Sequence, residues 1–225
     1  FLDVAHGHSE KVLLTIRHLK RAKVSILGKY VNIIAGNVAT PQAVRDLIEA
    51  GVDGIKVGIG PGSMCTTRIV TGCGVPQLTA IAICVEAANG RVPIIADGGM
   101  RTSGDIVKAL AAGADAVMLG GMLAGCLECP GELRDGKKTY RGMASKDAQV
   151  DWKGGVPQGM APEGVSTKIP TKGPVANVLS EICGGIRSGM SYLGAKSISE
   201  IRSLAFFIRV TEAGRFESNP HGLYT

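Results

Sequence analysis

The sequence predicts an α/β protein of the (β/α)₈ TIM-barrel class. One unit, made of an apolar strand, a short polar or Gly-rich loop and an amphipathic helix, recurs along the first part of the chain without any reversal of order. No Gly-x-Gly-x-x-Gly opens a helix at the start of the chain, which argues against the main alternative, a doubly wound dinucleotide-binding sheet. Polar residues also follow the carboxyl ends of the predicted strands, and these ends form the catalytic face of a barrel.

The strands are predicted from short apolar runs that Gly or polar residues bound. They are expected at residues 1–5, 31–35, 54–57, 92–96 and 116–119. The first run begins with the first residue of the sequence, so it supplies only the last residues of a strand. Asp3 then lies near a strand end, and Asn37 lies in the turn that follows the second strand.

Amphipathic spacing and local capping signals predict the helices. They are expected at residues 10–20, 41–50, about 78–88 and 103–112. Thr40 can cap the second helix, and Pro41 occupies its first turn, where the fixed φ of proline suits a helix. Ser103 opens the fourth helix.

The pattern stops after the fifth strand. Residues 126–171 are rich in Gly, Lys and Asp and have little periodicity, so they would form an unusually long loop for a compact domain. Such a loop is usually functional or disordered. We therefore expect a mobile insertion within a single domain that spans residues 1–225.

Composition excludes several classes of function. At 225 residues and 45% hydrophobic residues the chain can bury one sizeable core. No apolar run approaches the roughly 20 residues of a membrane span, and no leader is apparent, so no membrane partner is expected. The net charge of +6 is scattered and aromatics make up only 4%, which favours small anionic ligands over nucleic acid.

The cysteines and histidines do not predict a metal site. Six cysteines at irregular spacing in a chain of this size indicate a reducing cytoplasm rather than a disulfide framework. Cys126-x-x-Cys129 lacks a second pair, and His6-x-His8 has no carboxylate or cysteine at ligand spacing.

The loop after the third strand, residues 58–68, concentrates the candidate chemistry. Gly58, Gly60 and Gly62 permit positive φ and can turn backbone amides toward a ligand, and the hydroxyl of Ser63 suits a phosphate. Cys65 follows, and a loop rich in backbone N–H groups favours the reactive thiolate. Taken one by one, such glycines often form only a turn, and a cysteine is often a small buried apolar residue.

The full string is more specific than its parts. Gly-x-Gly-Pro-Gly-Ser-x-Cys-Thr-Thr-Arg at 58–68, followed by Gly-Cys-Gly-Val-Pro-Gln at 72–77, resembles the active-site loop of the inosine monophosphate dehydrogenase and guanosine monophosphate reductase family. The resemblance continues at residues 169–173 and 184–195, so it covers nearly the whole chain.

This resemblance implies a purine nucleotide, guanosine or inosine monophosphate (GMP or IMP), as substrate. The matching nucleotide-binding positions are Ser63, Asp97, Gly99, Gly120, Gly121, Tyr140, Gly142, Met143 and Ala144. Cys65 would attack carbon 2 of the base, which splits one difficult step into two easier ones. Thr67 and Glu163 match the positions that handle protons.

The resemblance also implies a cofactor and a cation. Asp3, Asn37 and Gly58 match positions near a nicotinamide dinucleotide, NAD(H) or NADP(H), which exchanges a hydride with carbon 2. The backbone at Gly60, Gly62 and Cys65 matches a site for a monovalent cation such as K⁺, completed by a tail that residues 217–221 resemble.

The direction of the reaction is predicted from the segment between Ser145 and Glu163. Dehydrogenases of the family usually carry an adjacent Arg-Tyr there that activates water, and this chain has neither residue in that segment. We therefore expect a GMP reductase. Arg68-Ile69-Val70-Thr71 and the tail at 217–221 are dehydrogenase-like, so an IMP dehydrogenase is the alternative.

The number of strands is smaller than a barrel requires. Eight are needed and five are predicted, and the family's barrel begins well upstream of the aspartate that resembles Asp3. We therefore expect about strands 4 to 8 of the barrel, and a homotetramer when the protein is complete. A truncated remnant without catalysis is a second alternative, because a fold does not guarantee a function.

Overall fold

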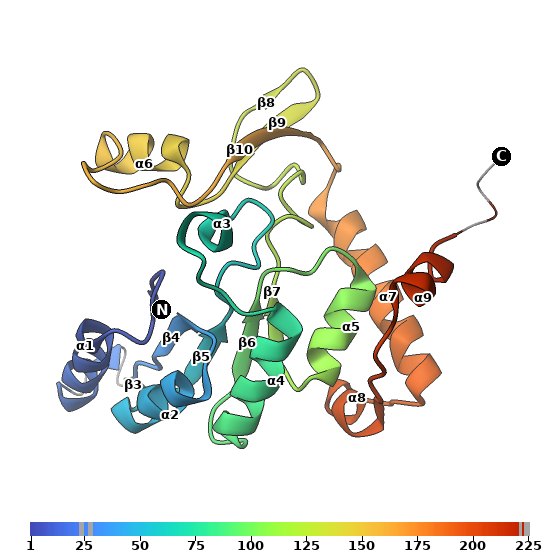
Figure 1. The fold of residues 1–225 in the computed structure, drawn as a ribbon, viewed down its shortest axis with the longest axis horizontal. Coiled ribbons are helices and arrows are strands. Elements are labelled where there is room, and N and C mark those ends of the chain that lie inside the picture. The colour runs from blue at the N-terminus through green and yellow to red at the C-terminus, as the bar shows by residue number, and fades with distance from the viewer. Residues whose placement is uncertain (23–24, 27–28, 221, 223–225) are drawn as a thin grey trace.

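The computed structural model describes residues 1–22, 25–26, 29–220 and 222, and a parallel sheet lies at its centre (Figure 1). Within these residues the sheet has the order β1-β4-β5-β6-β7, and each neighbouring pair is parallel. Its strands are β1 (Leu2–Asp3), β4 (Ile34–Val38), β5 (Gly54–Val57), β6 (Ile94–Asp97) and β7 (Ala116–Met118). Because strand order follows chain order with helical connections, this is the arrangement of consecutive units of a (β/α)₈ barrel, and the predicted fold class is confirmed.

The connecting helices confirm the predicted strand–helix alternation. They are α1 (Glu10–Arg21), α2 (Pro41–Ala50), α3 (Thr67–Thr71), α4 (Gln77–Ala88) and α5 (Ser103–Ala111), and a small hairpin of β2 (Ser25–Ile26) and β3 (Lys29–Tyr30) precedes β4. The helix α2 has its predicted bounds, because Thr40 Oγ1 accepts a hydrogen bond from Ala43 N and Gly51 ends the helix at φ 103°. None of the described helices combines the length and apolar character that crossing a membrane requires.

The main core lies between the sheet and the helices α1, α2 and α4. Ile55 and Val57 of β5 are fully buried, in one apolar cluster with Leu47 of α2 and Ile81 of α4. Each such side chain contributes about 1.5–3 kcal/mol through burial. Because successive residues of a strand point to opposite faces, Lys56 between them points away from this helical layer.

A second core joins α5 to two later helices, α7 (Val175–Leu193) and α8 (Ile198–Leu204). Glycines on α7 allow a close approach to α5: a Cβ on Gly189 would come within 2.8 Å of Val107, and one on Gly185 would overlap Ser103. The last helix, α9 (Glu212–Glu217), follows α8. The periodic pattern that predicted the earlier helices did not include these three.

Strand β4 lies further along the chain than predicted. The expected range was 31–35, and the observed strand runs from Ile34 to Val38, so Asn37 belongs to the strand and not to the turn after it. The register with β5 shifts between Gly36 and Val38, as at a β-bulge. A Cβ on Gly36 would lie 2.7 Å from the Cβ of Lys56 and closer still to its carbonyl oxygen, so glycine lets the two strands approach here.

Residues 126–171 contain regular structure that the sequence pattern did not predict. The strands β8 (Leu133–Arg134), β9 (Lys137–Arg141) and β10 (Ser166–Pro170) form an antiparallel sheet in the order β10-β9-β8, and α6 (Lys146–Lys153) lies between β9 and β10 in the chain. The β8–β9 turn is Asp135-Gly136 with φ of 52° and 70°, the signature of a type I′ hairpin. The residues of β8, β9 and β10 are mostly polar, so these strands lack the apolar alternation by which a strand is predicted. In Figure 1 these elements project above the end of the parallel sheet where α3 lies.

Candidate functional site

The loop between β5 and α3 carries the predicted nucleophile. After β5 the chain turns through glycines with positive φ, 149° at Gly58 and 79° at Gly60. Cys65 N donates to Gly62 O at 3.0 Å, and this turn places the half-buried Cys65 just before α3. The loop lies at the carboxyl end of β5, where the barrel class places its chemistry (Figure 1).

Cys65, Thr67 and Glu163 form a continuous chain of hydrogen bonds. The Cys65 thiol donates to Thr67 Oγ1 at 3.1 Å, and the Thr67 hydroxyl donates to Glu163 Oε2 at 2.8 Å. The Thr67 amide also lies 3.5 Å from the sulfur. A proton can therefore move between the sulfur and the carboxylate through one hydroxyl.

Glu163 reaches this position because its segment docks on the cysteine loop. Glu163 O accepts from Thr66 N at 2.9 Å, and Val165 N donates to Met64 O at 2.9 Å. On its other side, Glu163 N donates to Ala144 O at 3.0 Å. Backbone hydrogen bonds thus hold the carboxylate, which is distant in sequence, beside the thiol.

Four predicted nucleotide positions lie close together and are called the phosphate cradle after their predicted ligand; they are Ser63, Gly120, Gly121 and Tyr140. The hydroxyls of Ser63 and Tyr140 lie 2.8 Å apart. A Cβ on Gly121 would lie 2.9 Å from Ser63 Oγ, and a Cβ on Gly120 would lie 3.3 Å from the Tyr140 hydroxyl. The structure therefore brings together two hydroxyl donors and backbone free of side chains, a combination that suits a phosphate group.

The other predicted nucleotide positions lie around this cradle. Gly99 has φ 87° and packs against Pro61, whose Cβ would be 3.1 Å from a Cβ on the glycine. Gly142 packs against Met64 O, which would be 2.9 Å from its Cβ. The side chain of Met143 is 80% exposed. It would contact a purine base only when a nucleotide is bound against it.

Asp3, Asn37, Lys56 and Asp97 form a polar cluster at the ends of β1, β4, β5 and β6. Lys56 Nζ lies 3.0 Å from Asp3 Oδ1 and in direct contact with Asp97 Oδ2. Asn37 Nδ2 donates to the same Asp97 oxygen at 2.9 Å and to Gly58 O at 2.8 Å. Four predicted positions, Asp3, Asn37, Gly58 and Asp97, are therefore joined through the Lys56 ammonium group and the Asn37 side-chain amide.

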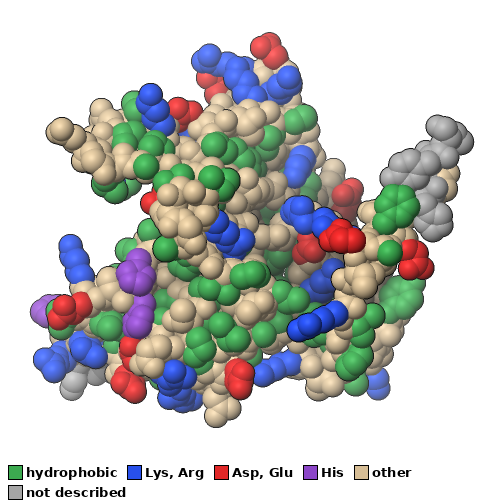
Figure 2. All heavy atoms as spheres, in the orientation of Figure 1, with side chains coloured by type: hydrophobic (Ala, Val, Ile, Leu, Met, Phe, Trp, Pro, Cys, Tyr) green, Lys and Arg blue, Asp and Glu red, His purple; other side chains and the backbone are tan. Residues whose placement is uncertain are grey.

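Asn37 also borders a hollow of about 220 Å³ between the His6–His8 turn, the start of α2 and Val75. Figure 2 shows the molecule hollowed on the side where α6 overhangs the sheet, with histidine side chains at its lower edge. Asn37 Oδ1 is buried, and no described residue donates to it. An N–H or O–H donor of a dinucleotide, from its carboxamide or ribose, fits this unmatched acceptor.

The side chain of His8, in this turn, already forms a hydrogen bond within the protein. His8 Nε2 lies 2.6 Å from Asp46 Oδ2, and this hydrogen bond holds the pKa of Asp46 below its ordinary value.

The predicted cation site at the backbone of Gly60, Gly62 and Cys65 stays a prediction. The tail expected to complete it does not lie beside the cysteine loop in the described residues, because α9 with residues 218–220 lies at the right of Figure 1, well away from α3. His221, part of the predicted tail, is outside the described residues. Among the side chains that the structure describes, no group of three His, Cys, Asp or Glu residues is placed to hold a metal ion.

Two residues of the site, Lys56 and Gln77, were not identified from the sequence. Lys56 is 3% exposed within an otherwise apolar strand, and a charge at such a position was the signal that could have identified it. Gln77 Nε2 donates to Val57 O at 2.9 Å and Asp97 O at 3.1 Å, which ties α4 to the ends of β5 and β6. No pattern around Gln77 marks that role.

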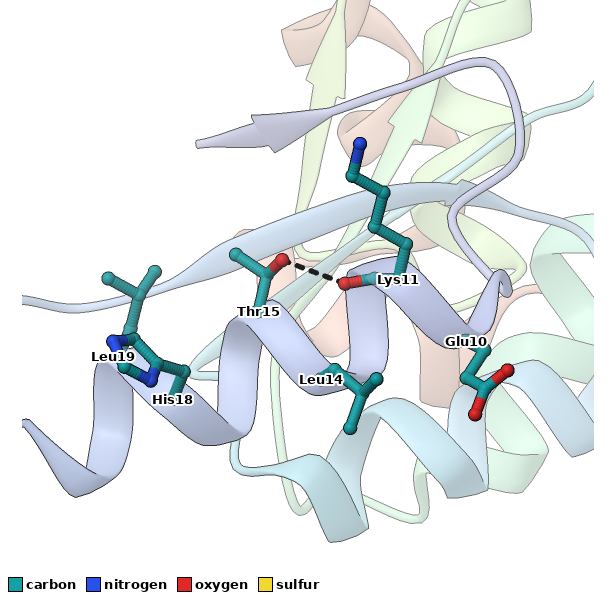
Figure 3. A pocket seen from close by; sticks show the side chains of 6 residues that line it. All are labelled: Glu10, Lys11, Leu14, Thr15, His18 and Leu19. Atoms are coloured by element: carbon teal, nitrogen blue, oxygen red, sulfur yellow. Dashed lines mark hydrogen bonds between the residues drawn. The ribbon is translucent and has the colours of Figure 1, made fainter.

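A larger hollow lies away from this chemistry. It measures about 540 Å³ and lies along α1, where Figure 3 shows its lining from Glu10 to Leu19. It contains none of the predicted site residues. We therefore do not assign it to the candidate site.

Comparison with known proteins identifies the family of the chain. Residues 1–221 match the family model described as "IMP dehydrogenase / GMP reductase domain". The chain is 49% identical to an inosine-5'-monophosphate dehydrogenase of Chlorobaculum parvum over 98% of its length, and 49% identical to a GMP reductase of Leishmania donovani over 99%. Each match covers 47% of the relative, so the chain spans about half the length of the curated relatives it matches.

A solved structure gives the same result. It is a cysteine-to-alanine variant of GMP reductase from Trypanosoma brucei in complex with guanosine 5'-monophosphate. The TM-score is 0.89 at 48% sequence identity, over 99% of this chain and 47% of that one.

Proposed function

The chain belongs to the IMP dehydrogenase / GMP reductase family, and from this premise we propose that the intact protein is a GMP reductase. It converts GMP, a reduced nicotinamide dinucleotide and one proton into IMP, ammonia and the oxidised dinucleotide. The observation that carries the covalent chemistry is the hydrogen-bonded chain from the Cys65 thiol through Thr67 to Glu163, and the residues between Ser145 and Glu163 carry the direction.

This chain of hydrogen bonds supplies the proton transfers that the reaction needs. Glu163 accepts the thiol proton through the Thr67 hydroxyl, and the Cys65 sulfur forms a bond to carbon 2 of the base. The same carboxyl group returns the proton to the amino group as its bond to carbon 2 breaks and ammonia leaves. A dinucleotide held beside Asp3 and Asn37 would supply a hydride for carbon 2. Cys65 takes back the electron pair of the carbon–sulfur bond as that bond breaks, and the proton that the overall reaction consumes restores its thiol.

Binding is assigned to the groups that the fold gathers. The phosphate cradle holds the nucleotide phosphate, and Asp97 accepts hydrogen bonds from the nucleotide ribose. Asp3 and Asn37 face the dinucleotide, and the hollow beside Asn37 supports that assignment. Residues 126–171 act as a flap over the nucleotide.

The reductase direction is proposed because the segment between Ser145 and Glu163 lacks the Arg-Tyr pair that activates water in dehydrogenases. Between Ser145 and Glu163 the sequence has neither arginine nor tyrosine, so this segment offers no such base to activate water against the covalent intermediate. Ammonia release and hydride delivery then remain as the productive steps. We propose NADP(H) or NAD(H) as the dinucleotide.

An IMP dehydrogenase is the second candidate, and Arg68 favours it. Arg68 donates to Ile59 O at 3.3 Å and Val75 O at 2.5 Å, so the dehydrogenase-like stretch 68–71 fastens both ends of the cysteine loop. In that case Thr67 with Glu163 activates the water. A monovalent cation at the Gly60, Gly62 and Cys65 carbonyls belongs to this alternative.

The decisive experiment measures both directions with the intact protein through nicotinamide absorbance. GMP with NADPH or NADH should yield IMP and ammonia faster than IMP with NADP⁺ or NAD⁺ yields xanthosine monophosphate. Steady xanthosine monophosphate production without reductase activity, especially with strong activation by K⁺, would replace the proposal with the dehydrogenase. Absence of turnover in both directions would favour the remnant without catalysis.

We propose that the intact protein is a cytoplasmic homotetramer. All six cysteines are unpaired, which suits a reducing compartment. Analytical ultracentrifugation and cell fractionation test these two assignments.

A further inference from the structure

The polar cluster contains a buried cation to which neither the sequence nor the family match assigns a role. The side chain of Lys56 is 4% exposed, whereas its partners Asp3 and Asp97 are 59% and 22% exposed. Its strand neighbours Ile55 and Val57 pack in the apolar core, so nothing in the fold itself requires a charge at this position. A buried lysine is costly unless it is paired, and Lys56 is paired twice.

We propose that Lys56 is a positioning residue that holds the carboxylates of Asp97 and Asp3 as one unit, and so supports nucleotide and dinucleotide binding together. The inference rests on the proposed function, which places Asp97 at the nucleotide ribose and Asp3 at the dinucleotide. It goes further, because it makes one side chain responsible for the geometry of both ribose acceptors.

The hydrogen-bond pattern leaves one oxygen of the Asp97 carboxylate and one of the Asp3 carboxylate available to ligands. Asp97 Oδ2 is engaged by Lys56 Nζ and by Asn37 Nδ2 at 2.9 Å, and Asp3 Oδ1 is engaged by Lys56 at 3.0 Å. The second oxygen of each carboxylate has no hydrogen-bond donor among the described residues. Each carboxylate can therefore accept ribose hydroxyls with one oxygen while Lys56 fixes the other.

The charge of Lys56 also keeps the two carboxylates close to each other. Both contact one ammonium group, so without it two negative charges would repel across a short distance in a partly buried site. Gly36 lets β4 approach β5 closely at this point, since a Cβ there would lie 2.7 Å from Lys56 Cβ and closer still to Lys56 O.

The test measures ligand binding directly in the intact protein, without turnover. Lys56→Met should weaken the binding of both GMP and NADPH in calorimetry by about tenfold or more, because each loses a fixed acceptor. Lys20→Met is the matched control: Lys20 pairs with Asp53 at 2.7 Å beside the amino end of β5, and its loss should leave both affinities within about twofold. Thermal melts confirm that the variants are folded.

A double-mutant cycle separates positioning from direct ligand contact. If Lys56 acts on the nucleotide through Asp97, adding Lys56→Met to Asp97→Asn should change GMP affinity by less than about twofold, while NADPH affinity still falls about tenfold through Asp3. The double variant removes opposite charges together, so it tests the idea even if Lys56→Met alone does not fold.

Three results would overturn the inference. They are an unchanged affinity for either ligand in folded Lys56→Met, an equal loss in Lys20→Met, and a full additional loss of GMP affinity in the double variant. The failure of the proposed function looks different, because then the wild-type protein itself binds neither GMP nor NADPH.

Discussion

Replacing Thr67 by valine tests the proton path at its middle atom. Valine has the shape of threonine without the hydroxyl, so the change removes the 3.1 Å bond from Cys65 and the 2.8 Å bond to Glu163 and little else. Glu163 is half-buried and can regain water, so the folded state should lose no more than about 1 kcal/mol. The chemistry should suffer more, because Glu163 contacts the sulfur only through this hydroxyl.

The expected loss follows from that geometry. Positioned acid–base groups contribute about 10²–10⁴ in rate, so kcat of Thr67→Val in the intact protein should fall by about that factor, or about 3–5 kcal/mol of transition-state stabilisation. KM for GMP should stay within about threefold, because the hydroxyl is not assigned to ground-state binding. The assay is the initial rate of NADPH oxidation, with quenched samples analysed for IMP.

Two controls sharpen this prediction. Thr71→Val alters the same helix and removes an exposed hydroxyl that donates to Thr67 O at 2.7 Å, and its rate should stay within about twofold of wild type. Thr67→Ser keeps the hydroxyl and should recover most of the activity. The reasoning is refuted if Thr67→Val retains its rate within about threefold, or if Thr71→Val is equally slow.

The remaining predictions concern the nucleophile, the phosphate cradle and the acid response. Cys65→Ala should abolish turnover while GMP affinity stays within about threefold in calorimetry, and residual turnover near the wild-type rate would contradict the covalent mechanism. Gly121→Ala should weaken GMP binding about tenfold or more, because its Cβ meets a cradle hydroxyl at 2.9 Å, whereas Gly184→Ala, with open space around its Cβ, should leave binding unchanged. Burial alone would raise the pKa of Asp53, but hydrogen bonds from Lys20 and a backbone amide hold it below its ordinary value. This stabilisation is present above the unfolded pKa of about 3.9 and is lost as pH falls through the folded value, so melts of Asp53→Asn should depend less on pH in that range than wild type.

Local signals explain what the sequence predicted well. The bounds of α2 and β5 were predicted because a threonine cap, a proline in the first turn and flanking glycines each act within a few residues. The recurring strand–helix unit likewise predicted the parallel sheet and its order. Residues of the cysteine loop are consecutive in the chain, so their chemistry could be inferred from the string alone.

The differences arise where the decisive contacts are distant or the signals are polar. Strand β4 extends through Gly36-Asn37 because it pairs with β5 up to Val38, and glycine at position 36 leaves room for the backbone and Cβ of Lys56 opposite it. The β8–β9 hairpin did carry an Asp-Gly turn signal at residues 135–136, but its polar strands lack the apolar alternation by which strands were sought. Helix α7 contains Gly185 and Gly189, which lower helix propensity and are present for close packing on α5.

The sequence by itself determined the repeating strand–helix units and the identity of the cysteine loop, because each depends on neighbours along the chain. Only the tertiary structure decided that Glu163 meets Thr67 and that Lys56 joins Asp3 to Asp97. These contacts join residues about 40 to 100 positions apart, and they form only when parallel strands align their carboxyl ends and the segment after β9 docks on the cysteine loop. The residues that can take part in chemistry can therefore be identified from the local sequence. Their arrangement in one site results from long-range packing.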